Sequence, residues 1–179
     1  MALLKIARMG HPVLRQTAQQ VGDVTEPEIQ RLIDDMQDTL VDANGVGLAA
    51  PQVHAPVRCL VYRSLDSDGA GRAAIRTLIN PVLTVMDDTV DVAWEGCLSI
   101  PELRGAVPRW RGLRVKALDR RGDSLDFRVD GFAARVIQHE TDHLNGVLYI
   151  DRMTDLSMLA FESEMHHFLS EEPDESDSD

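Results

Sequence analysis

The sequence predicts an α+β fold in which antiparallel β-sheets pack around one central helix, with an N-terminal and a C-terminal helix beside them. Two observations carry this prediction. Segments with strand-like patterns precede and surround one helical segment at 131–144. They do not alternate regularly with helices, as the strands of repeated βαβ units would.

Three helices are expected. "TEPEIQRLIDDMQDTLVDANG" (25–45) carries an apolar face at helical spacing, has Thr25 and Glu28 in capping-box positions, and ends before Gly45. The central helix starts after Asp130 as N-cap and is stopped by Asn145-Gly146. A last amphipathic helix is expected from about Thr154. Its apolar residues are Leu156, Leu159, Phe168 and Leu169.

Several segments have the composition of strands. "VRCLVYR" (57–63) is typical of a buried strand. Segments 77–86 and 89–96 are expected to form strands on either side of an acidic turn at Asp87-Asp88. Segment 113–129 is expected to form a hairpin that turns at Arg121-Gly122-Asp123, and "DSDGAGRAA" (66–74) a flexible surface hairpin.

The composition is that of a globular domain, with 44% hydrophobic and 27% charged residues among 179. Six of the acids behind the net charge of −12 lie in 170–179, so we expect a catalytic domain over 1–169 and an acidic, disordered tail over 170–179. The domain has no basic stripe with aromatics, which argues against specific nucleic-acid binding. No apolar run approaches a membrane span and no signal-peptide core is present, so a cytoplasmic protein is expected.

The motif "QHETDHL" (138–144) lies on the central helix. His139 and His143 are four residues apart, so they share one face and can bind one metal ion. Glu140 is offset by one position, so it can act on a metal-bound water without ligating the metal. Val136 extends the same face, which predicts that this face points inward.

A catalytic metal site needs a third protein ligand, and three candidates compete. A metzincin-like pattern would need a histidine where the chain has Tyr149. A thermolysin-like peptidase would use Glu162 or Glu164, about twenty residues downstream. Cys97 offers a thiolate, and it follows Glu95-Gly96 at the end of an alternating strand. We favour Cys97, because Cys59 by contrast sits in an apolar run typical of a structural cysteine.

Three segments in this order resemble peptide deformylase: "GVGLAAPQ" (45–52), "EGCLS" (95–99) and "QHETDHL" (138–144). The segments "GHPVLR", "LINP" and "LDRRG" are also similar to the family. The resemblance covers about residues 5 to 153. It implies a metal-dependent hydrolase that removes the N-formyl group from the formyl-methionine of nascent polypeptides and releases formate.

The resemblance also implies roles for individual residues. The metal ligands would be Cys97, His139 and His143, with Glu140 as general acid/base. The Gln52 side-chain amide and the Leu98 backbone N–H would face the developing oxyanion. The substrate-binding residues would be Val46 and Gly47 along the peptide backbone, Arg104 at the rim, and Phe132, Arg135 and Val136 around the first side chain. Arg135 is a polar choice there, expected to place its stem in the pocket wall and its head in water.

The implied metal is Fe²⁺, with Ni²⁺, Co²⁺ or Zn²⁺ as substitutes. The implied partners are N-formylmethionyl nascent peptides, and we expect a monomer working close to the ribosome. If the residues are considered without the family resemblance, two other classes of function remain possible. One is a zinc endopeptidase that uses Glu162 or Glu164, and the other is a member of the fold that binds peptides without cleaving them.

Overall fold

The structure is a computed structural model that describes residues 2–67 and 73–169. Within this part the chain forms three α-helices and one six-stranded sheet whose strands pair antiparallel, which confirms the expected α+β class. The helices are α1 (Pro27–Asp42), α2 (Gly131–Leu144) and the short α3 (His166–Leu169). The strands are β1 (Gly47–Ala49), β2 (Cys59–Ser67), β3 (Ala73–Cys97), β4 (Ile100–Leu118), β5 (Ser124–Asp130) and β6 (Leu159–Phe161).

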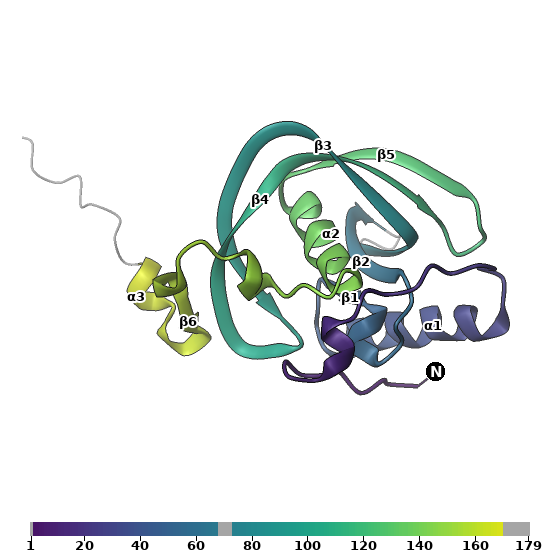
Figure 1. The fold of residues 1–179 in the computed structure, drawn as a ribbon, viewed down its shortest axis with the longest axis horizontal. Coiled ribbons are helices and arrows are strands. Elements are labelled where there is room, and N and C mark those ends of the chain that lie inside the picture. Colours follow the sequence, from purple (N-terminus) through teal and green to yellow (C-terminus); the bar gives the residue numbers. More distant parts are fainter. Residues whose placement is uncertain (1, 68–72, 170–179) are drawn as a thin grey trace, which may run out of the picture.

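The sheet runs in the order β1-β2-β3-β4-β5, and β6 adds to β4. β3 and β4 are long, and together they curve around α2, which crosses the middle of the molecule (Figure 1). α1 lies at the opposite side from β6 and α3 (Figure 1). The expected turn at 121–123 is confirmed, since β4 and β5 pair across it. The expected hairpin at 66–74 falls mainly on residues 68–72, and the expected tail is 170–179; both lie outside the described residues.

The expected acidic turn at Asp87-Asp88 is wrong. β3 runs through it without reversing, and β4 pairs with it on both sides, from Val85 with Leu113 to Val90 with Trp110. The register shifts between these pairs, so the acidic residues form an irregularity that bends the strand. Asp87 accepts hydrogen bonds from the backbone N–H and the hydroxyl of Thr89 at this irregularity. An aspartate that bonds two residues ahead is common in turns, which explains why the sequence indicated one.

α1 uses the predicted apolar face but not the predicted cap. Ile33, Met36 and Leu40 are fully buried in a core shared with β1 and β2. The capping-box prediction is wrong, because Thr25 bonds to Asp23 and the N-cap position is Glu26, whose side chain makes no capping bond. Pro27 starts the helix instead. Its fixed backbone angle suits the first position, where an N–H would have no helical partner.

α2 is the most enclosed helix, and every residue from 134 to 144 is buried. Ile137 and Leu144 pack with Leu60 and Val115 of the sheet. Asp130 stands at the N-cap as predicted, although its side chain makes no capping bond. Gly146 stops the helix in a left-handed conformation with φ +73°. Apolar packing against the sheet therefore already holds the helix in place, apart from any contact that its polar residues make.

The expected C-terminal helix is present but much shorter than predicted from Thr154. Leu156–Met158 and Glu162–Glu164 form 3₁₀ turns, β6 lies between them, and only His166–Leu169 is helical. β6 pairs its backbone with Leu103–Gly105 of β4. The exposed Leu156 and Phe161 contribute no buried helical face. A free edge of β4 thus supplied hydrogen-bond partners that favour extended backbone over helix.

Gly146→Ala should destabilise the fold more than Gly10→Ala. Both glycines have positive φ, which costs an alanine about 1–2 kcal/mol. Only at Gly146 would the new Cβ also meet backbone, 2.8 Å from the carbonyl carbon of Arg15; at Gly10 it would meet nothing within 4 Å. Overpacking adds about 1–3 kcal/mol. Urea unfolding of both variants measures the difference, and equal losses would show that the contact with Arg15 relaxes freely.

Candidate metal centre and substrate pocket

Three side chains form a metal-binding arrangement between the end of β3 and α2. The Cys97 sulfur lies 3.2 Å from Nε2 of His143, and the donor atoms of Cys97, His139 and His143 all lie within 4.8 Å of one another. Donors at ordinary metal–ligand distances of about 2.0–2.3 Å around one ion would lie about 3.5 Å apart. Thiolate and imidazole are ligands that transition metals prefer. The group can therefore hold a metal ion.

A buried carboxylate orients one of these imidazoles. Nδ1 of His139 lies 2.8 Å from Oε2 of Glu95, and both side chains are buried. A proton on Nδ1 donated to this carboxylate leaves Nε2 free as the ligand atom. Such a carboxylate partner fixes both the ring orientation and the tautomer of a ligating histidine.

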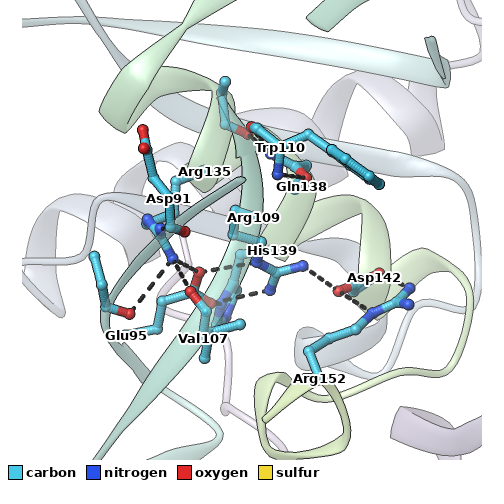
Figure 2. A network of polar contacts seen from close by, with 12 residues as sticks. Asp91, Glu95, Val107, Arg109, Trp110, Arg135, Gln138, His139, Asp142 and Arg152 are labelled. Atoms are coloured by element: carbon cyan, nitrogen blue, oxygen red, sulfur yellow. Dashed lines mark hydrogen bonds and ion pairs between the residues drawn. The ribbon is translucent and has the colours of Figure 1, made fainter. Parts of the chain in front are cut away.

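Glu95 is in turn held by two buried arginines, as Figure 2 shows. Arg109 donates to both of its oxygens, at 2.9 and 3.0 Å, and Arg135 donates to Oε1 at 2.8 Å. The same Arg109 also pairs with Asp142 on α2, and Asp142 pairs with Arg152 (Figure 2). A chain of charged groups therefore runs from the metal centre through the protein to the far side of α2.

This environment shifts the pKa values of His139 and His143 in opposite directions. Burial alone would raise the pKa of Glu95, but hydrogen bonds from His139 and Arg109 bring it down to about 2. Burial likewise opposes charge on His139, yet its hydrogen bonds with Cys97 and Glu95 raise its pKa well above the usual value. A metal ion bound by Nε2 would therefore have to displace the proton that this nitrogen carries in the metal-free protein. Burial lowers the pKa of His143 well below it, so His143 offers a neutral imidazole.

Glu140 faces the strand that enters the site. A Cβ on Gly47 would clash with the Glu140 carboxylate, so only glycine lets β1 pass this close. Oε2 of Glu140 is buried and has no hydrogen-bond partner among the residues that the structure describes. Burial raises the pKa of Glu140 to about 7, in the range of a general base at neutral pH.

Gln52 lies beside the Cys97 sulfur, and Leu98 follows Cys97 in the chain. Gln52 is buried, its Oε1 accepts from the N–H of Ala49, and its Nε2 lies 3.5 Å from the sulfur. Nε2 also donates to the Ser99 hydroxyl at 3.2 Å. Leu98 lies in the two-residue turn between β3 and β4, directly after Cys97. These contacts fix the amide of Gln52 beside the metal donors.

A pocket of about 450 Å³ opens over this centre. Val46 and Gly47 line one side, where β1 is the edge strand of the sheet. An edge strand offers backbone groups to which an extended peptide can pair. Phe132 and Val136 of α2 also line the pocket, with Phe132 exposed and Val136 buried. Arg104 stands at the rim, where it pairs with Glu162 at 2.9 Å.

Arg135 lines this pocket, but the expectation that its head reaches water is wrong. The side chain is buried and its guanidinium bonds to Glu95 and to the backbone oxygens of Asp91, Ala93 and Val107. Those acceptors belong to β3 and β4. The arginine therefore cross-links the pocket wall to the partner of His139.

The competing ligands do not join the centre. Among the described residues, the metal-binding group contains Cys97, His139 and His143 only. Glu162 is occupied by Arg104, and Glu164 lies near His167 at 3.6 Å. Tyr149 is buried with its ring stacked on His139, at 6.1 Å between centroids. These positions favour Cys97 as the third ligand over both peptidase-like sets.

Sequence reasoning gave no role to Glu95, Arg109 or Asp142. Glu95 and Asp142 lie inside two of the quoted motifs, and both are charged residues in segments otherwise predicted to be buried. A charge in such a segment indicates a buried partner. The partners of Glu95 lie 14 and 44 residues away in the chain, at Arg109 and His139. No local sequence pattern reveals contacts over such separations.

Comparison with known proteins identifies the family. The model of the polypeptide deformylase family matches residues 3–158. The chain belongs to this family. Peptide deformylase 1 of Nitrosomonas europaea is 44% identical over 159 residues, covering 87% of this chain and 90% of that protein. Peptide deformylase 1 of Prochlorococcus marinus is 42% identical over 169 residues, covering 92% and 88%.

Solved structures agree with the family assignment. Peptide deformylase from Thermotoga maritima superposes with a TM-score of 0.80 at 37% identity, covering 87% of this chain and 100% of that one. A Met-Ala-Ser-bound peptide deformylase from Acinetobacter baumannii gives 0.78 at 32% identity, covering 85% and 99%. Members of the family are metal-dependent hydrolases that remove the N-formyl group from nascent polypeptides. No helix in the described part of the chain is long and apolar enough to cross a membrane.

Cys97→Ala should abolish metal retention, whereas Glu162→Ala should leave it nearly intact. Cys97 lies among the metal donors, while Glu162 is exposed and paired with Arg104. Metal content after anaerobic purification and dialysis measures the effect, with circular dichroism as the check on folding. A folded Glu162→Ala protein that loses its metal, beside a Cys97→Ala protein that keeps it, would contradict this ligand set.

Proposed function

We propose that this chain hydrolyses the formamide bond of an N-terminal formyl-methionine, giving formate and a free amino terminus, through the residues described above. The observation that carries the proposal is the buried carboxylate of Glu140, whose Oε2 has no partner within the described part of the chain, beside the Cys97, His139 and His143 group. A metal ion held by these three donors would polarise the formyl oxygen and lower the pKa of a coordinated water.

The proposed roles follow from where each group lies. Glu140 takes the proton from the attacking water and returns it to the leaving amine, for which a pKa of about 7 is suited. Gln52 Nε2 and the Leu98 N–H face the oxygen that gains negative charge. Loss of one such donor costs about 2.7–4 kcal/mol of transition-state stabilisation.

Substrate binding is proposed along the edge of β1. Val46 and Gly47 would pair with the extended peptide backbone, because this strand has β2 on one side only. Phe132, Val136 and the stem of Arg135 would surround the methionine side chain, and Arg104 would contact the peptide beyond it. The Acinetobacter baumannii relative crystallised with Met-Ala-Ser supports this proposal, since that peptide has the free methionine terminus that deformylation leaves.

We also propose Fe²⁺ as the native metal, with Ni²⁺, Co²⁺ or Zn²⁺ as substitutes. One thiolate with two imidazoles suits all four ions, so the support for iron is the family resemblance. A monomer acting in the cytoplasm, close to the ribosome, completes the proposal, because formylated nascent chains emerge there.

Glu140→Gln should keep the metal and lose about 10²- to 10⁴-fold in turnover, because the amide cannot take the proton. The measurement is formate release from a formyl-Met-Ala-Ser peptide, with metal content in parallel. Glu28→Gln, an exposed glutamate on α1, is the matched control and should behave as the parent. Cleavage of an internal peptide bond without formate would favour the endopeptidase, and binding without any product would favour the non-catalytic peptide binder.

Iron-loaded protein should lose activity in air faster than nickel-loaded protein. Oxygen can oxidise ferrous iron and the Cys97 thiolate, whereas nickel resists the one-electron step. The comparison is the decay of formate release in air, with the sulfur oxidation state of Cys97 followed by mass spectrometry. Equal lifetimes and equal Cys97 oxidation would contradict the iron assignment while leaving the hydrolase assignment untouched.

A further inference from the structure

A second hollow lies on the side of α2 that faces away from the metal centre. It is a groove of about 620 Å³ between α2 and the curved β3–β4 ribbon. The helix lines it with Gln138, Thr141 and Asp142, and its C-cap residue Asn145 continues this side. These positions recur every three or four residues, so they form one helix face, and it is not the face of His139, Glu140 and His143. The volume is in the range of small-molecule sites, about 300–1,000 Å³.

The charge of this groove is opposite to that of the chain. Three arginines and one aspartate line it, namely Arg58, Arg109, Asp142 and Arg152, whereas the whole chain has a net charge of −12. Arg109 and Asp142 are buried and satisfied within the Glu95 network. Arg152 pairs with Asp142 and is half exposed. The groove is thus a local site for an anion on an acidic protein.

Arg58 is the least neutralised of these cations. It is half-buried and makes no ion pair with any described residue. Its contacts are the carbonyl of Leu144, the Asn145 side-chain oxygen at 2.9 Å and the carbonyl of Pro81. These are neutral acceptors. Burial accordingly lowers the pKa of Arg58. Capping the end of α2 explains its contact with Leu144, but it does not explain the hollow beside it.

The rest of the wall is apolar and open to solvent. Val82, Val85 and Val90 of β3 line the groove with exposed fractions of 61%, 40% and 44%, and Trp110 of β4 with 40%. A group of exposed apolar side chains around a hollow is a common mark of a binding surface. A ligand for this groove therefore needs both an apolar body and an anionic end.

We propose that this groove is a second binding site, which takes a small amphipathic carboxylate with its charged end at Arg58 and Asn145 and its apolar body along Val82, Val85, Val90 and Trp110. Arg58 can donate a charge-assisted hydrogen bond to the carboxylate, which is stronger than a bond to a neutral acceptor. The apolar body covers side chains that are otherwise exposed. The site is independent of the deformylase activity proposed above.

Octanoate is a suitable probe, since it combines a carboxylate with an aliphatic chain. The chain has two tryptophans, so a Trp94→Phe background leaves Trp110, in the groove wall, as the only one. Titration of the metal-loaded protein should give a saturable change in Trp110 fluorescence. Octanamide lacks the charge and acetate lacks the apolar body, so each should bind at least about tenfold more weakly.

Two substitutions locate the site, each with a matched control. Arg58→Gln should weaken octanoate binding about tenfold, while Arg121→Gln, which removes the same charge from an exposed turn, should not. Val82→Glu should weaken it at least fivefold by placing a like charge in the groove. Val92→Glu alters an equally exposed valine of β3 that does not line the groove, and should bind as the parent.

The outcomes separate the alternatives. Loss of binding in Arg58→Gln and Val82→Glu, with both controls unchanged, establishes the site. Because Val82 is exposed, its variant tests the proposal even if Arg58→Gln unfolds at the end of α2. Saturable binding that is equal in all four variants would place the carboxylate elsewhere, such as at the metal centre, and overturn the proposal. The absence of saturable binding up to about 10 mM would overturn it as well.

Discussion

The structure depends on one buried carboxylate, that of Glu95, which contacts three positively charged or protonated partners. Arg109 and Arg135 donate to it from β4 and α2, and His139 shares a proton with it from the metal-binding face of α2. A buried charge is tolerated only when it is paired and hydrogen-bonded, so these groups require one another. Removal of Glu95 would take away the carboxylate that pairs with Arg135 and the group that orients the His139 ring. The position of α2 inside the curved ribbon is thereby tied to the orientation of a metal donor.

This arrangement explains how the site is prepared before a metal or a peptide arrives. His139 is oriented by Glu95, Gln52 by Ala49 and Ser99, and the cysteine by a two-residue turn between long strands. Each of these three side chains is therefore held in place by contacts that do not involve the metal. Oε2 of Glu140 has no hydrogen-bond partner among the described residues, and the carboxylate lies against the entering edge strand because Gly47 leaves room for it. Groups held in advance cost little reorganisation during the reaction.

The sequence predicted the parts of the fold that depend on local pattern. The apolar spacing located α1 and α2, and the spacing of His139 and His143 placed two donors on one helix face. The capping-box prediction at Thr25 failed for a local reason, but two other failures occurred where a distant strand decided the outcome. Asp87 looked like a turn, yet β4 pairs on both sides of it; residues 159–161 looked helical, yet β4 offered them a free edge. Such pairings join residues far apart in the chain, and periodicity carries no information about them.

Arg135 is a second example of contacts with residues far apart in the chain that local sequence patterns did not reveal. These contacts also affect how the substrate pocket is built. The position of Arg135 beside the pocket was implied by the family resemblance, but its acceptors lie 28 to 44 residues away in β3 and β4. Its stem lines the pocket, while its head holds Glu95 and the backbone of both strands. A change at this position would therefore alter the wall of the pocket and the support of His139 together. Through this one side chain, a change in the pocket wall is coupled to the orientation of a metal donor.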